Sequence, residues 1–244
     1  MSTQAVRHHP VRVGTHLGVS VHWAWLAGGF VVAFAVPFLL AEARSAFGVA
    51  FEVNRDLYYG AYALAVIALF WLWSRSTGYD LVAATRRRWL LAVGLGLAAA
   101  GVMAVMVLRT DDATARPDGI ELAGALFWRG IVYGITDGML LSVFPILVVF
   151  AAFAGSRLNE RLAGKVVIGI VALLASLAMT AVYHFGYSDF RSDKVAKPLV
   201  GDAVWSVPTL VTLNPIGAPI AHAGLHTAAV LHSYETDTFL PPHE

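Results

Sequence analysis

Long apolar stretches constrain the fold of this chain more than any other feature. Several of them meet or approach the ~20 residues that a helix needs to cross roughly 30 Å of hydrocarbon. Inside a bilayer the backbone amides find no water, and a helix satisfies them within its own segment. An all-α, polytopic integral membrane protein is therefore predicted. The stretches are Val19–Ala41, Leu57–Trp73, Trp89–Leu108, Gly138–Ala154 and Val166–His184.

A sixth apolar region, Leu199–His232, is interrupted by Asn214–Pro215 and by Gly217–Ala218–Pro219. Proline removes a helical hydrogen bond, and glycine permits close packing. The pattern predicts a short re-entrant or outer segment, a break, and then a helix from about Ala218 to His232. The region from Glu121 to Asp137 is amphipathic and is predicted to be an interfacial helix or an outer extension of the fourth span. About six transmembrane helices are expected.

Composition favours a surface that faces lipid rather than water. Only 14% of the residues are charged and 58% are hydrophobic, whereas a soluble domain has roughly 25% and 45–50%. The formal net charge of +1 offers no basic stripe, so the lipid bilayer is an expected partner and nucleic acid is not. The absence of cysteine excludes disulfides, thiolate ligands and a cysteine nucleophile.

No linker divides the chain, so residues 1–244 are interpreted as one transmembrane domain. Ionisable residues inside spans are costly and tend to face an interior site. Because they gather toward the C-terminus, we expect residues 19–110 to form scaffold spans and residues 121–233 to carry any site.

Lysine and arginine in short loops predict orientation, because such loops stay on the cytoplasmic side. Residues 1–18 are therefore expected to be a cytoplasmic segment, and six spans place both termini in the cytoplasm. On the size and alanine richness of the chain, the expected location is the cytoplasmic (inner) membrane of a bacterium. Arg191, Lys194 and Lys197 fall on the outer side and depart from the rule. The cytoplasmic set is Arg7, Arg12, Arg75, Arg86, Arg87, Arg88, Arg157, Arg161 and Lys165.

His222 and His226 form the sharpest chemical pattern in the sequence. Residues four apart share one helix face, and two imidazoles at that spacing can bind one metal ion. His184 could supply a third nitrogen and Asp137 an oxygen. Three protein ligands with one open position are what a hydrolytic zinc site requires.

The same residues also have structural interpretations. Polar side chains in helix bundles often only form hydrogen bonds between helices. Arg129 and Asp137 lie on roughly one side of their helix, so they could pair through Tyr133 or with other spans. In the site interpretation, Asp137 is a base or a fourth ligand, and Arg129 steadies a developing oxyanion or fixes its helix.

Three short motifs resemble the CAAX-processing and bacteriocin-processing (CPBP, also ABI) family of intramembrane metalloproteases. They are LFWRG at Leu126–Gly130, the aromatic-rich helix end at His184, and PIAHAGLH at Pro219–His226. The resemblance covers the C-terminal half of the chain and implies a metal-dependent protease. The family's paired glutamates, which activate the attacking water, would stand at positions 124–125. This chain has glycine and alanine there.

The leading hypothesis is a membrane-embedded hydrolase in which His184, His222 and His226 bind a divalent metal, first of all zinc. Its substrate would be a membrane peptide or, as in ceramidase-like enzymes, a lipid amide or ester. One alternative is a non-catalytic relative that acts as a membrane binding or partner protein. Others are a small transporter built around the broken helix, or a haem protein with His22 and His184 as axial ligands.

Overall fold

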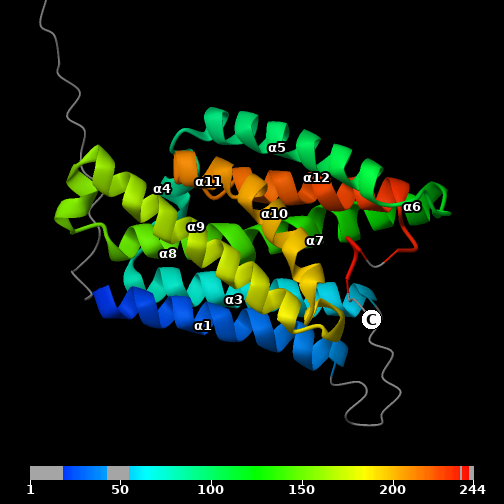
Figure 1. Cartoon of the computed structure of the whole chain (residues 1–244), viewed down its shortest axis with the longest axis horizontal. Coiled ribbons are helices and arrows are strands. Elements are labelled where there is room, and N and C mark those ends of the chain that lie inside the picture. The colour runs from blue at the N-terminus through cyan, green and yellow to red at the C-terminus, as the bar shows by residue number, and fades with distance from the viewer. Residues whose placement is uncertain (1–18, 43–54, 237, 242–244) are drawn as a thin grey trace, which may run out of the picture.

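The computed structural model describes residues 19–42, 55–236 and 238–241, which form a helical bundle without a strand (Figure 1). The all-α prediction is therefore confirmed. Within these described ranges, five helical segments are long and apolar enough to cross a membrane. They are Val19–Leu40, Leu57–Thr77, Trp89–Thr110, Gly119–Ala152 and Leu162–Phe185.

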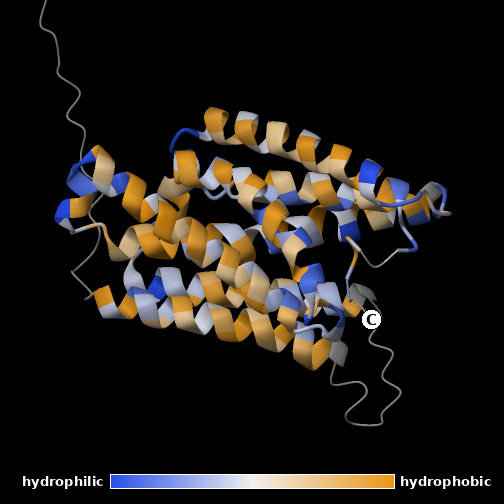
Figure 2. Ribbon diagram, viewed as in Figure 1, coloured by the Kyte–Doolittle hydropathy of each residue, from blue (hydrophilic) through white to orange (hydrophobic). Residues whose placement is uncertain are grey.

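Hydrophobic residues predominate along the helices of the bundle, and hydrophilic residues gather toward its two ends (Figure 2). Leu64 and Ile67 on one helix, and Leu90 and Leu97 on another, are each more than half exposed. Exposed leucine and isoleucine in such numbers suit contact with lipid chains. The protein is therefore a polytopic membrane protein.

The first half of the described chain contains α1 (Val19–Pro37), η1 (Phe38–Glu42), α3 (Arg55–Thr77), α4 (Leu81–Arg86) and α5 (Trp89–Thr110). The fourth span is built from α6 (Gly119–Ala125), η2 (Leu126–Val132), α7 (Tyr133–Asp137), η3 (Gly138–Val143) and α8 (Phe144–Ala152). The remaining elements are η4 (Arg157–Glu160), α9 (Leu162–Phe185), η5 (Ser188–Phe190), η6 (Asp193–Val195), α10 (Ala196–Trp205), α11 (Val207–Thr212) and α12 (Gly217–His232).

The fourth span is one helical run of 34 residues, Gly119–Ala152. At about 1.5 Å per residue it is roughly 50 Å long, which exceeds the hydrocarbon thickness. The region from Glu121 to Asp137 is therefore an extension of that span, one of the two predicted alternatives. The π-helical segments η2 and η3 flank α7. Such segments change the direction of the side chains that follow them and are frequent at functional sites.

The last apolar region is broken where the sequence predicts. After α10 and α11 the helix stops at residues 213–216, and α12 begins at Gly217 and ends at His232. The Asn214 amide donates to the backbone carbonyls of Thr85 at 2.8 Å and Arg87 at 2.6 Å. These bonds attach the break to the loop before α5.

The loops with Arg86–Arg88 and with Arg157 and Arg161 lie at the left of Figure 1, and we call this the arginine-rich end. Because Asn214 is bonded there, α10 and α11 together return the chain to this end, and α12 then leads away from it (Figure 1).

The two limits of the described chain consequently lie at opposite ends of the bundle. Trp23 in α1 contacts Phe153 near the arginine-rich end, with 6.1 Å between ring centroids. At the other end, the Tyr59 hydroxyl donates to the carbonyl of Pro241 at 2.6 Å. The arrangement predicted from the sequence placed both termini on one side because it counted Leu199–His232 as one crossing. In the structure, this region runs between the two ends of the bundle twice, first through α10 and α11 and then through α12 (Figure 1). Residues 1–18 and 242–244 lie outside the described ranges.

Glycines allow α12 to lie directly against the fourth span. Gly130, Gly134 and Gly138 recur every four residues and face α12. A Cβ on Gly134 would lie 2.6 Å from the Cα of Ala223, and a Cβ on Gly138 would lie 2.7 Å from the Cα of Pro219. The two backbones are therefore in contact, as in other small-residue helix interfaces. This contact sets the distance between the side chains of the site.

Candidate metal centre

Asp137, His222 and His226 converge in the interior of the bundle. Each offers one ligand atom, and these atoms all lie within 4.8 Å of one another. Oδ2 of Asp137 lies 3.4 Å from Nε2 of His226 and 3.8 Å from Nδ1 of His222. The three residues are 5%, 1% and 3% exposed, respectively. Three of the five predicted site residues are thus brought together from two distant parts of the sequence.

These separations suit a tetrahedral metal ion. Zinc bonds to nitrogen and carboxylate oxygen measure about 2.0–2.2 Å, so two ligand atoms of a tetrahedron lie roughly 3.3–3.6 Å apart. The carboxylate is 3.4 Å from one histidine nitrogen and 3.8 Å from the other. The two separations from Asp137 therefore fit an ion after shifts of a few tenths of an ångström. The two histidine nitrogens lie within 4.8 Å of each other, so these imidazoles would have to approach by up to about 1.2 Å.

The proton positions on His226 also favour a cation beside the carboxylate. Nδ1 of His226 lies 2.7 Å from the carbonyl oxygen of Phe239. A carbonyl only accepts, so Nδ1 donates and carries the proton. In the neutral ring, Nε2 then turns a lone pair toward the Asp137 carboxylate at 3.4 Å. Two acceptors in this position repel one another unless a metal ion or a proton lies between them. In metal sites, a ligand histidine commonly donates its other ring N–H to a backbone carbonyl, as His226 does to Phe239.

His222 is buried without hydrogen bonds. Neither of its ring nitrogens has a partner in the described part of the chain. A buried, unsatisfied polar group costs about 1–3 kcal/mol, and a metal ion on Nδ1 would satisfy one of the two. The ring packs against Trp205, with 4.1 Å between centroids. The indole therefore limits how far the imidazole can turn.

Tyr62 holds the carboxylate in place. Its hydroxyl donates to Oδ1 of Asp137 at 2.9 Å, which leaves Oδ2 toward the histidines. Sequence reasoning missed this residue. The available signal was a tyrosine in the middle of an apolar stretch, where a buried hydroxyl needs a partner.

Tyr62 belongs to a larger buried cluster of tyrosines. The Tyr58 hydroxyl bonds to those of Tyr183, at 2.8 Å, and Tyr187. The Tyr133 hydroxyl bonds to that of Tyr183 at 2.7 Å, and its ring packs edge-to-face with that of His226, with 4.7 Å between centroids. The hydroxyls of Tyr58, Tyr133, Tyr183 and Tyr187 thus bond to one another beside the site. The cluster comprises Tyr58, Tyr59, Tyr62, Tyr133, Tyr183 and Tyr187.

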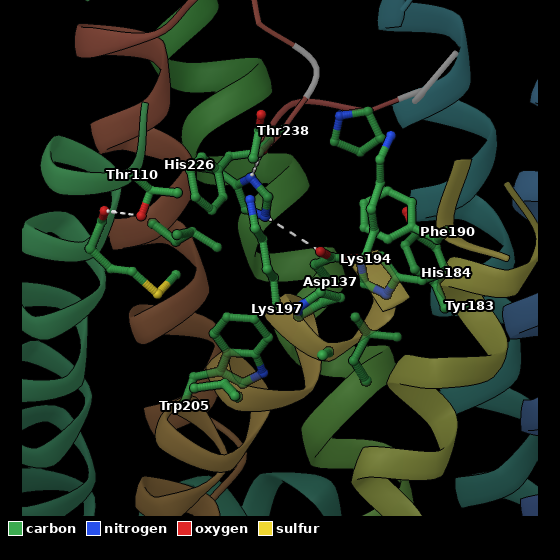
Figure 3. A pocket seen from close by; sticks show the side chains of 18 of the residues that line it. Thr110, Asp137, Tyr183, His184, Phe190, Lys194, Lys197, Trp205, His226 and Thr238 are labelled. Atoms are coloured by element: carbon green, nitrogen blue, oxygen red, sulfur yellow. Dashed lines mark hydrogen bonds and ion pairs between the residues drawn. The ribbon is translucent and has the colours of Figure 1, made fainter. Parts of the chain in front are cut away.

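A cavity of about 590 Å³ opens beside the metal-ligand candidates. Asp137 and His226 line it and are turned toward each other, with His184 nearby on the other side of Asp137 (Figure 3). Its charged residues besides Asp137 are Asp189, Lys194 and Lys197. The apolar lining includes Met106, Leu141, Phe190, Trp205, Leu225 and Phe239.

His184 lines this cavity but does not belong to the three-residue group. Its Nδ1 donates to the carbonyl of Thr180 at 2.8 Å, one turn earlier in α9. The neutral ring therefore carries no proton on Nε2. The structure thus brings Asp137, rather than His184, together with the histidine pair.

Arg129 lies away from the group. Its guanidinium donates to the hydroxyl of Tyr234 at 2.7 Å and lies over the Tyr234 ring, 5.1 Å from the centroid. Tyr133 does not connect it to Asp137, because that hydroxyl bonds to Tyr183. Arg129 thus attaches the fourth span to the segment after α12.

The paired histidines considered for haem are also far apart. His22 lines a second cavity at the arginine-rich end, whereas His184 lines the cavity at the metal-ligand candidates. One haem cannot be bound by both.

No protein-family model, curated protein or solved structure matches this chain. The fold and the buried group therefore describe it only as an all-α membrane protein with a histidine and aspartate cluster. The resemblance to the CPBP family stays a prediction. Asp137 lies thirteen positions after Gly124, which is roughly 20 Å along a helix. The carboxylate is thus displaced from the family's glutamate positions by more than three turns.

Proposed function

We propose that the protein is a membrane-embedded, metal-dependent hydrolase. Asp137, His222 and His226 would bind a divalent metal ion, with zinc as the first choice. The observation that supports the proposal is the meeting of these three buried groups at separations of 3.4 and 3.8 Å. The donor set of two imidazoles and one carboxylate is common in hydrolytic zinc sites, which keep a further position open.

A zinc ion bound here would act as a Lewis acid that polarises a carbonyl group and lowers the pKa of a water molecule. The surrounding residues have their own tasks. Tyr62 fixes the rotation of the carboxylate through Oδ1, and the Phe239 carbonyl fixes the tautomer of His226. His184 would accept the proton of the attacking water at Nε2, because Nδ1–H is bonded to Thr180.

The cavity supports a substrate that is largely apolar near the bond to be cleaved. Its volume of about 590 Å³ suits a molecule of drug size. Met106, Trp205 and Leu225 contribute apolar walls beside Asp137 and His226. A membrane peptide, or a lipid amide or ester, has the required combination of an apolar body and a polar carbonyl.

Metal content tests the proposal directly. Purified wild-type protein, supplied with zinc and then desalted, should retain about one zinc per chain by mass spectrometry. The double substitution His222→Ala with His226→Ala should remove it. His232→Ala is the matched control, because this residue lies on the same helix but bonds to the carbonyl of Asp111. A wild type that retains no divalent metal refutes the proposal.

Catalysis needs a separate assay. Detergent-solubilised protein is incubated with a panel of fluorogenic membrane peptides and lipid amides, with and without a chelator. We expect chelator-sensitive hydrolysis, and His184→Gln should lower kcat strongly while zinc content stays at the wild-type value. Stoichiometric zinc without turnover of either class would favour the non-catalytic alternative.

We further propose that the membrane is the cytoplasmic membrane of a bacterium and that the arginine-rich end faces the cytoplasm. The positive-inside rule supports this orientation, and the size and alanine richness of the chain support the choice of membrane. Since the chain has no cysteine, single cysteines can report sidedness. In whole cells, a membrane-impermeant maleimide should label Asp112→Cys and leave Asn159→Cys unlabelled. The reverse pattern contradicts this orientation.

A further inference from the structure

A second cavity, of about 850 Å³, lies at the arginine-rich end of the bundle. Its lining residues come from α1, α8, η4, α9 and α11 and from the segment that joins α3 to α5. None of them belongs to the proposed metal centre. Its apolar lining includes Leu147, Phe150, Leu162, Val166, Leu210 and Val211.

The charged lining of this cavity is predominantly positive. The positively charged lining residues are Arg87, Arg88 and Lys165, whereas Asp80 is the one negatively charged residue among them. Oδ1 of Asp80 already accepts the backbone N–H of Ala83, where it caps α4. In the described ranges no ion pair joins Asp80 to the three cations. The cavity therefore has uncompensated positive charge.

His22 adds a polar group with no partner. Its side chain lines the cavity and is only 7% exposed, and Nδ1 has no hydrogen bond within the described residues. Tyr79 also lines the cavity, and burial raises its pKa to about 12, against the opposing effect of Arg87. The phenol is thus neutral at physiological pH and can donate a hydrogen bond.

Backbone strain is concentrated at this cavity. Arg88 and Leu213, with φ of 49° and 54°, are the non-glycine residues with positive φ among those described, and both line the cavity. This conformation is costly for residues with a Cβ, and it tends to persist at functional sites where the surroundings enforce it. Here Asn214 enforces it by bonding to the carbonyls of Thr85 and Arg87.

We propose that this cavity binds the headgroup of an anionic phospholipid. Arg87, Arg88 and Lys165 would bind the phosphate, and basic pockets between membrane helices recognise such headgroups. The apolar rim distinguishes a lipid from a free anion. Leu162 and Val166, which are 81% and 54% exposed, lead from the cavity to the lipid-facing surface, where acyl chains would lie.

The test compares lipids of equal chain length but different charge. Delipidated protein in a neutral detergent is titrated with phosphatidylglycerol or phosphatidylcholine, and binding is followed by native mass spectrometry and by the melting temperature. Wild type should bind phosphatidylglycerol at least tenfold more tightly. The substitutions Arg87→Gln and Lys165→Gln together should abolish this preference. The control pair Arg157→Gln and Arg161→Gln removes the same charge at the same end, outside the cavity, and should preserve it.

Three results would overturn the proposal. One is equal affinity of wild type for the two lipids, and another is an equal loss of preference in both double variants. The third is a melting-temperature increase with inorganic phosphate that matches the increase with phosphatidylglycerol, which would indicate a free-anion site. The melting temperature in phosphatidylcholine identifies a variant that has lost its fold. If the double variant has lost its fold, Lys165→Gln is measured alone, and it should lower the preference for phosphatidylglycerol over phosphatidylcholine. Zinc content is recorded in parallel, so the result is independent of the metal centre.

Discussion

The contact between Gly134 and α12 offers the sharpest test of how the proposed metal site is built. A Cβ at position 134 would lie 2.6 Å from Ala223 Cα, 2.8 Å from Ala223 N and 2.9 Å from the carbonyl carbon of His222. All three are backbone atoms, so no side-chain rotation can relieve the overlap. Ordinary contact begins near 3.4 Å. Gly134→Ala should therefore push α7 and α12 apart by about 0.8 Å.

The separation of the ligand atoms should change by a similar amount, because Asp137 follows Gly134 by three residues and the histidines lie on α12. The distance from Asp137 Oδ2 to His226 Nε2 would rise from 3.4 Å to roughly 4.2 Å. Metal–ligand bonds tolerate changes of about 0.2 Å. We expect zinc affinity to fall tenfold to a hundredfold, about 1.4–2.7 kcal/mol, and overpacking to cost about 1–3 kcal/mol of stability.

Zinc dissociation constants are measured by competition with a chromophoric chelator, at a temperature below the melting point of the variant. Gly124→Ala is the matched control, since this glycine lies on the same continuous helix and has no atom within 4 Å of the added Cβ. It should bind zinc as wild type does. If Gly134→Ala also binds zinc with wild-type affinity, the helix contact does not determine the ligand separation and the reasoning fails.

Two further substitutions and one truncation test other parts of the structure. Tyr62→Phe removes the hydroxyl that donates to the Asp137 carboxylate at 2.9 Å. We expect the unfolding free energy, measured by denaturant titration, to fall by about 1.5–3 kcal/mol. An unchanged unfolding transition would show that this hydrogen bond does not stabilise the protein. A chain that ends after Ser233 lacks the Phe239 carbonyl bonded to His226, and zinc affinity should fall at least about tenfold in the chelator assay; equal affinity would show that this carbonyl is dispensable. Asn214→Ala removes three hydrogen bonds at the helix break, and the unfolding free energy should drop by about 2–4 kcal/mol. A loss below about 1 kcal/mol would show that these bonds do not hold the break in place.

Local sequence determined the helical spans and one half of the site. Apolar stretches of about 20 residues can only be helices in a bilayer, and this rule does not depend on how the helices pack. The interruption around Asn214 and Pro215 likewise predicted the break before α12. His222 and His226 share one face because of the helical period alone, so their pairing was predictable.

Only the tertiary structure decided which residues meet that histidine pair. Helical periodicity specifies the face of one helix, but it does not specify which face of a neighbour lies opposite, at what depth, or at what distance. Here the glycines at 130, 134 and 138 allow backbone contact that brings Asp137 to the pair, while His184 remains on a separate cavity wall. The direction of α10 and α11, and with it the position of the described C-terminal segment, depends on hydrogen bonds between residues far apart in the chain. Such contacts leave no periodic signal in a single sequence, because each of them joins segments whose spacing along the chain is arbitrary.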